Sequence, residues 1–119
     1  MATIGDRMTG PVISIGQDAS IKSATEKIYA HAIGSLLVTH DEKFVGIITK
    51  TDSMLKVLIK NLDADSTPVS DVISEALITI DVGETLDSAK KLLDEKSFRH
   101  LPVTRDNEII GILSPKDLR

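Results

Sequence analysis

Two short stretches of the sequence combine residue types that could bind a phosphate and a sugar. Residues 46–52 (GIITKTD) and 111–117 (GILSPKD) each carry an apolar run, a hydroxyl residue and, three positions later, an Asp. The apolar run predicts a buried strand, and the hydroxyl can cap a helix that follows it. Free amides at a helix start attract anions, and an Asp on the first turn can accept hydrogen bonds from ribose hydroxyls. Each stretch therefore predicts half of a nucleotide site, with Thr49 and Asp52 in one and Ser114 and Asp117 in the other.

The same spacing also has a simpler interpretation. Thr-x-x-Asp and Ser-x-x-Asp are close to capping-box patterns, in which both side chains only start a helix. A single copy of the motif would favour this interpretation, whereas two copies in matching surroundings favour binding. For Asp52 the ligand-facing role is favoured, and for Asp117 both interpretations stay open.

The two motifs end two copies of one longer sequence unit. Residues 12–53 align with residues 77–118 without a gap, and many aligned positions are identical or exchange one apolar residue for another. Such self-similarity indicates a tandem duplication. We therefore predict repeat 1 over residues 1–62, a linker over 63–68 and repeat 2 over 69–119, which together form one compact pair.

Both repeats predict the same order of elements. A short helical turn leads into a brief strand, and a helix follows whose N-cap is Ser20 or Thr85. Two strands joined by a polar turn come next, and a closing helix ends the unit. In residue numbers, the helical turns are 4–8 and 69–73, the first strands 12–15 and 77–80, the polar turns 41–43 and 106–108, and the closing helix of repeat 1 about 50–62.

The apolar pattern predicts how these elements assemble. One helical stripe consists of Ile21, Ala24, Ile28 and Ala32, and its counterpart of Leu86, Ala89, Leu92 and Leu93. A unit of two or three short strands with helices on one side cannot bury its sheet alone. We therefore predict an α+β fold (an α/β sandwich) in which two β-α-β-β-α repeats pack sheet to sheet with pseudo-twofold symmetry. The starts of the two closing helices would face a shared cleft.

Composition argues against several classes of function. The formal net charge of −4 disfavours a nucleic-acid binder. Cysteine is absent, and His31, His40 and His100 show no metal-ligand spacing, so we expect no metal site. No apolar run approaches the ~20 residues of a membrane span, and no secretory signal is visible, so we expect a cytoplasmic protein without membrane contact. No catalytic motif appears, so we expect no enzyme activity.

A tandem β-α-β-β-α unit whose copies end in Gly-apolar-apolar-Thr/Ser-x-x-Asp resembles the CBS domain pair, or Bateman module. The run Arg99-His100-Leu101-Pro102-Val103 and the helix positions Ala24 and Ala89 add to the resemblance. It covers the whole chain and implies a stand-alone regulatory protein. It also implies an adenosine nucleotide as ligand (AMP, ADP or ATP), with S-adenosylmethionine or NAD(H) less expected, and no required cofactor.

The resemblance implies two ligand clefts, in which the Asp holds the ribose, the hydroxyl contacts phosphate and the base lies against the other repeat's first strand. The main cleft would comprise Thr49, Asp52, Ala76, Leu77, Ile78, Arg99, His100 and Lys116. The second would comprise Pro11, Val12, Ile13, Ser35, Ser114 and Asp117, with Gly34 and Thr51 at the remaining phosphate positions.

Charge distinguishes the two predicted clefts. Arg99, Lys116 and a protonated His100 would bring positive charge to the main cleft, whereas the matching positions of the second cleft are neutral. Because charge-assisted hydrogen bonds are about twice as strong as neutral ones, we expect phosphate in the main cleft. The second cleft would be empty, weak or suited to a less charged ligand. Arg99 in a surface ion pair and His100 as a packed neutral residue remain alternatives.

We therefore predict a regulatory adenosine-nucleotide sensor that signals to an unidentified partner protein. A ligand bridging the repeats would favour one arrangement through its differential affinity. Apolar positions of the closing helix predict a homodimer, whose parallel or antiparallel arrangement stays open, through Met54, Leu55, Leu58 and Leu62. The alternative is a ligand-free dimerisation or protein-interaction module with the same fold.

Overall fold

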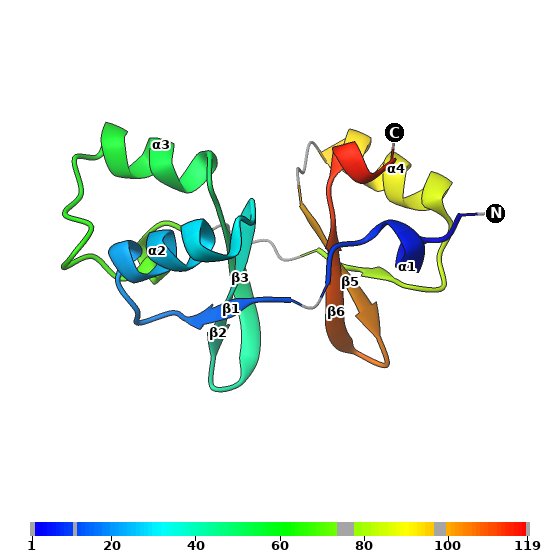
Figure 1. Ribbon diagram of the computed structural model, residues 1–119, viewed down its shortest axis with the longest axis horizontal. Coiled ribbons are helices and arrows are strands. Elements are labelled where there is room, and N and C mark those ends of the chain that lie inside the picture. Colours follow the sequence, from blue (N-terminus) through cyan, green and yellow to red (C-terminus); the bar gives the residue numbers. More distant parts are fainter. Residues whose placement is uncertain (1, 11, 74–77, 97–99, 119) are drawn as a thin grey trace. The chain divides into compact units, whose positions relative to one another are not determined.

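The computed structural model describes residues 2–10, 12–73, 78–96 and 100–118. The chain forms two compact units, which we call the central unit (Ile13–Leu77) and the split unit (Met1–Val12 together with Ile78–Arg119). Each unit has its own three-stranded sheet and its own helices (Figure 1). The predicted α+β class with two sheets is therefore confirmed, and the packing of sheet against sheet stays a prediction.

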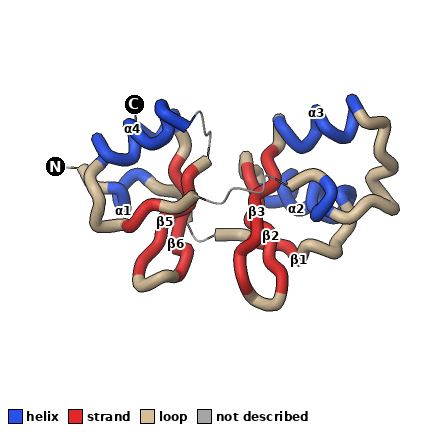
Figure 2. The backbone as a smooth tube through the Cα atoms, turned by 180° about the vertical axis from the view of Figure 1, so that it is seen from behind, coloured by secondary structure: helices blue, strands red, loops and turns tan. Residues whose placement is uncertain are grey.

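The central unit contains one mixed sheet with its helices on the same side of it (Figure 2). The edge strand β1 pairs in parallel with β2, and β2 pairs antiparallel with β3. In chain order the elements are β1 (Ser14–Gly16), α2 (Ile21–His31), β2 (Ser35–His40), β3 (Lys43–Thr49), α3 (Asp52–Ile59) and the 3₁₀ helix η1 (Val69–Asp71). The closing helix α3 is thus shorter at both ends than predicted.

The predicted apolar stripe of α2 forms the core of the central unit, with one exception. Ile21, Ala24 and Ile28 are buried, and the last two pack in one cluster with residues of β2 and β3. Ala32, predicted to continue the stripe, is instead the exposed C-cap residue, with a left-handed backbone (φ 51°). The stripe therefore ends one turn early, because the chain must reverse direction to enter β2.

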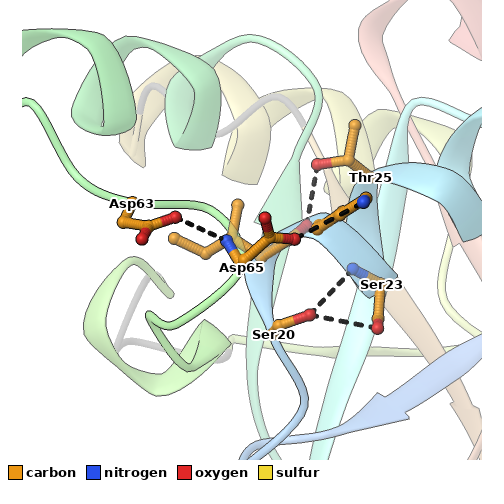
Figure 3. A network of polar contacts seen from close by, with 7 residues as sticks. Ser20, Ser23, Thr25, Asp63 and Asp65 are labelled. Carbon is orange, nitrogen blue, oxygen red and sulfur yellow. Dashed lines mark hydrogen bonds and ion pairs between the residues drawn. The ribbon is translucent and has the colours of Figure 1, made fainter.

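The predicted linker folds back onto the start of α2. The N–H groups of Ile21 and Lys22 donate to the carbonyls of Thr67 and Ala64, each at 3.0 Å. Ser20 caps the helix as predicted, since its Oγ accepts from the Ser23 amide at 3.1 Å (Figure 3). The first-turn amides of α2 are thereby occupied by the chain itself, so this helix start is used for structure.

The split unit has the same sheet order, with parallel β4–β5 pairing and antiparallel β5–β6 pairing. Its elements are α1 (Ile4–Arg7), β4 (Ile80–Asp81), α4 (Leu86–Lys96), β5 (Leu101–Arg105), β6 (Glu108–Leu113) and the 3₁₀ helix η2 (Pro115–Leu118). Its core cluster contains Ile4 from the N-terminal segment together with residues of the second repeat. The first helix of the chain therefore contributes to the core that the second repeat builds.

Backbone contacts attach this N-terminal segment to β6. Thr9 and Ile112 exchange two hydrogen bonds of 2.9 Å, N–H to carbonyl in both directions. Gly111 permits the close approach, because a Cβ at that position would clash with the Met8 side chain and lie 3.1 Å from the Thr9 carbonyl oxygen. Thr3 and Asp6 form a capping box that starts α1.

Several predicted boundaries need correction. The first strands are shorter and begin later than predicted, since β1 starts at Ser14 and β4 spans only two residues. The hairpin turns contain two residues each, and all four have positive φ: Asp41, Glu42, Asp106 and Asn107. Such two-residue turns match the twist of the flanking strands. In the described ranges, no helix is both long and apolar enough to cross a membrane.

Candidate functional site

The first motif places two hydroxyl side chains at one end of the central sheet. Ser35 opens β2 and Thr49 closes β3, and the two residues face each other in the antiparallel register. Both are buried, at 8% and 6% exposure. Beyond them, the Lys50 amide donates to the Gly34 carbonyl at 2.9 Å, which holds the strand ends together. We call Ser35, Thr49 and Asp52 the Thr49–Asp52 half-site.

Helix α3 begins at Asp52, three residues after Thr49 and two residues later than the predicted start at about residue 50. Its N-cap residue is Thr51 rather than Thr49, and Thr51 makes no side-chain capping bond. Of Asp52 only the backbone is described. The N-cap position thus belongs to Thr51, and both interpretations of the Thr49–Asp52 spacing stay predictions.

In the second motif the acid turns back onto its own hydroxyl residue. Asp117 Oδ2 accepts hydrogen bonds from the Ser114 amide at 2.8 Å and from Ser114 Oγ at 3.1 Å. This is the capping arrangement that the sequence left open for Asp117. Both bonds use the same carboxylate oxygen. We call His100, Ser114 and Asp117 the Ser114–Asp117 half-site; His100 is partly buried immediately before β5.

Sequence reasoning missed a cation at the second half-site. The Arg7 guanidinium, on α1, donates from Nη1 to the Asp117 carbonyl oxygen at 3.2 Å. Repeat alignment offered no signal for it, because the residue that aligns with Arg7 is the buried Val72. The positive charge of Lys116, which the sequence assigned to the main cleft, is exposed on η2 beside Asp117 in the chain.

A second missed cation lies at the edge of the central sheet. Lys27 Nζ, on α2, donates to the Ser14 carbonyl on β1 at 2.7 Å. Ser14 directly follows Ile13, which the sequence placed against a base in the second cleft. This contact ties helix α2 to the edge strand β1, so a purely structural role accounts for it.

The remaining predicted site residues divide into two groups. Val12, Ile13 and Ile78 are described and partly buried. Pro11, Ala76, Leu77 and Arg99 lie outside the described residues. Each predicted cleft combines residues of both units, so the clefts stay predictions, and the two half-sites are what the structure describes.

Within the described part of the chain, neither buried polar atoms nor possible metal ligands indicate a further site. Among the described residues, no buried side-chain nitrogen or oxygen lacks a hydrogen-bond partner. The same residues contain no group of three or more His, Cys, Asp or Glu side chains that could hold a metal ion. His31 and His40 are exposed.

An apolar face of α3 remains exposed. Leu55, Leu58 and Ile59 are 50%, 76% and 80% exposed, and their spacing places them on one side of the helix. Of the four positions predicted for a dimer contact, Leu55 and Leu58 belong to this face, whereas Met54 and Leu62 are partly buried. Ile59 was not anticipated.

Comparison with known proteins identifies related sequences over nearly the whole chain. The family model described as CBS domain matches residues 4–52 and 69–119. CBS domain-containing protein YhcV of Bacillus subtilis (strain 168) is 28% identical over 118 residues, which cover 99% of this chain and 84% of that protein.

Solved structures share the fold. The crystal structure of the CBS domain NE2398 has a TM-score of 0.88 and 35% identity, covering 99% of this chain and 95% of that one. The CBS domain pair of protein MJ0100, in complex with 5′-methylthioadenosine and S-adenosyl-L-methionine, has a TM-score of 0.86 and 24% identity, covering 98% and 96%. At that identity the likeness concerns the fold alone.

Proposed function

The chain belongs to the CBS domain family, and from that premise we propose that it is a regulatory module that binds an adenosine nucleotide and signals to a partner protein. The observation that carries this proposal is the Thr49–Asp52 half-site. A buried hydroxyl ends β3, and a helix without a side-chain cap from Thr51 begins three residues later at an Asp. Backbone amides at such a helix start suit a phosphate, and an acid on the first turn suits ribose hydroxyls.

The proposal of an adenosyl ligand for this chain rests on the types of residue at the half-site, and a related fold is known to hold such ligands. The complex of the MJ0100 pair shows that a protein of this fold holds adenosyl compounds. For this chain we propose AMP, ADP or ATP, with S-adenosylmethionine and NAD(H) as less favoured ligands. In the proposed main site Thr49 contacts phosphate, Asp52 holds the ribose, and Arg99, His100 and Lys116 contribute positive charge. Ala76, Leu77 and Ile78 line the base.

Signalling would follow from linkage. A ligand shifts a protein between two states only by its difference in affinity for them. The partner protein would read the state that the ligand favours, and by reciprocity it would change the affinity for the ligand by the same factor. No chemical step is required, so we propose a binding module without enzyme activity.

A melting screen tests the proposal. Wild-type protein is heated with AMP, ADP, ATP, S-adenosylmethionine or NAD(H), and at least one adenine nucleotide is expected to raise the melting temperature. A ligand at 100 times its dissociation constant stabilises by about 2.7 kcal/mol. No shift with any of the five compounds would refute nucleotide binding.

Two isosteric variants locate the site. Asp52→Asn is expected to abolish most of the ligand-induced rise in melting temperature, because a neutral amide replaces the carboxylate that accepts from the ribose hydroxyls. Asp117→Asn keeps an oxygen that can accept from Ser114, so it tests ligand contact without removing the local cap. Loss of the shift in Asp117→Asn with full retention in Asp52→Asn would reverse the proposed ranking of the two sites.

The exposed face of α3 favours a second function, association of two copies through this helix. Leu58→Glu and Ile59→Glu are expected to convert a dimer into a monomer, because each places a charge within the apolar contact. Ser66→Glu, at an exposed turn position, is the charge-matched control. Light scattering after gel filtration measures the mass, and a monomeric wild type would contradict association. Dimerisation without any nucleotide shift would instead identify a ligand-free interaction module.

A further inference from the structure

The Ser114–Asp117 half-site differs from its counterpart in having a cation from a distant part of the chain. Arg7 and Asp117 are joined by the 3.2 Å bond from Nη1 to the carbonyl oxygen. The guanidinium belongs to the same compact unit as Ser114 and Asp117. At the aligned position of the other repeat, Val72 is buried and apolar. There the cation comes instead from the closing helix, since Lys56 Nζ donates to the Val72 carbonyl at 3.4 Å.

The N-terminal segment holds Arg7 in this place through contacts on both sides of it. Before Arg7, Ile4 is fully buried in the core of the split unit. After it, Thr9 exchanges two hydrogen bonds with Ile112 on β6, only two residues before Ser114. The capping box of Thr3 and Asp6 fixes the start of α1. The position of Arg7 is therefore set by packing and backbone bonds as well as by its own contact.

The local chemistry suits an anion attached to a riboside. A guanidinium presents planar N–H donors that match phosphate oxygens in a bidentate manner. Lys116, exposed on η2, belongs to the proposed main site, so the charge at this half-site comes from Arg7. The Asp117 carboxylate accepts both of its hydrogen bonds from Ser114 through Oδ2. One cation thus accompanies one acid whose bonds to Ser114 engage a single oxygen.

We propose that Arg7 is a specificity-determining residue that makes the Ser114–Asp117 half-site select a phosphorylated adenosine over an uncharged one. This inference rests on the proposed nucleotide-binding function and changes one part of it. The charge comparison from the sequence left the second site with neutral partners only, whereas Arg7 supplies the positive charge there. The ligand class is an adenosine monophosphate or polyphosphate, with the phosphate at the guanidinium.

The test compares AMP with adenosine, which has the same base and sugar and no phosphate. Binding is measured by titration calorimetry on the Asp52→Asn protein, so that the second half-site is observed alone. Arg7→Gln in that background is expected to weaken AMP about tenfold, the loss typical of a charge-assisted hydrogen bond, and to leave adenosine unchanged. Arg105→Gln removes one exposed arginine from the end of β5 in the same unit and is the charge-matched control.

A purely structural role for Arg7 predicts a different result. If the guanidinium only ties α1 to η2, Arg7→Gln weakens AMP and adenosine equally or lowers the melting temperature of the ligand-free protein more than Arg105→Gln. Either result, or an unchanged AMP affinity, overturns the inference. If the Asp52→Asn protein binds neither compound while the wild type binds AMP, the inference fails and the proposed function stands. If the wild type binds no adenine nucleotide, the proposed function itself fails.

Discussion

Up to the end of their last strand, the central and split units have the same irregularity in sheet register and the same helix caps. In both, the antiparallel ladder shifts by one residue at the matching point, between Val38 and Thr39 and between Val103 and Thr104. Ser20 and Thr85 cap their helices by accepting from an amide three residues later, at 3.1 and 3.0 Å. Sheet register and helix starts therefore follow the duplication closely.

The closing motifs differ. In the central unit the Lys50 amide bonds to Gly34, and an eight-residue helix begins at Asp52. At the position of Lys50 the split unit has Pro115, which has no amide to donate. There the chain forms a 3₁₀ turn, and Asp117 bonds back to Ser114. The residue after the hydroxyl therefore donates a backbone hydrogen bond in the central unit and has no amide in the split unit.

The largest expected effect concerns the segments that begin the two repeats. Ile4 and Val69 occupy matching repeat positions and are both fully buried, but in different units. Ile4→Ala is expected to cost about 2–5 kcal/mol and to lower hydrogen-exchange protection in β5 and β6. Val69→Ala, with a smaller loss, is expected to lower protection in β2 and β3. Loss of protection by Ile4→Ala in β2 and β3 alone would contradict the division into units.

A second variant tests the attachment of the N-terminal segment to β6. Gly111→Ala is expected to destabilise by roughly 1–3 kcal/mol, because the added methyl group meets Met8 and the Thr9 carbonyl. Gly16→Ala is the control, since nothing lies within 4 Å of a Cβ built there. Urea denaturation measures both. Equal denaturation midpoints for the two variants would contradict this prediction, since they would show that Met8 and Thr9 move aside without loss of stability.

The closing motifs can be compared directly through their polar side chains. Asp117→Ala removes two hydrogen bonds to Ser114 and is expected to destabilise by about 1 kcal/mol. Asp117→Asn should recover much of this loss, because the amide oxygen can still accept. Thr51→Ala is expected to change stability little, since Thr51 makes no side-chain cap. A Thr51→Ala loss as large as that of Asp117→Ala, measured by thermal melting, would remove the distinction between the motifs.

The smallest effect concerns the hairpin turns. Glu42 and Asn107 occupy the same turn position, with φ of 65° and 69°. Asn tolerates this left-handed backbone better than Glu does. We expect Glu42→Asn to stabilise the protein and Asn107→Glu to destabilise it, each by up to about 1 kcal/mol. A higher melting temperature for Glu42→Asn together with a lower one for Asn107→Glu would support this prediction, and two shifts of the same sign would contradict it.

Local patterns in the sequence were sufficient to predict the duplication, the α+β class, the caps at Ser20 and Thr85 and the buried stripe of α2. The caps and the stripe depend on residues close together in the chain, and the duplication is visible when the sequence is aligned with itself, so none of them requires knowledge of tertiary contacts. Boundaries were less accurate at Ala32 and at the turns, where a left-handed backbone decides where an element ends.

Only the tertiary structure decided which unit receives the N-terminal segment and which charges meet the closing motifs. Arg7 and Asp117 are 110 positions apart, and their contact exists because Ile4 and Thr9 find burial and backbone partners in the second repeat. No periodicity encodes such a contact, since the residue that aligns with Arg7 is Val72, which accepts from Lys56 through its carbonyl instead. The duplicated sequence determined two similar frameworks, and long-range packing made the surroundings of their closing motifs different.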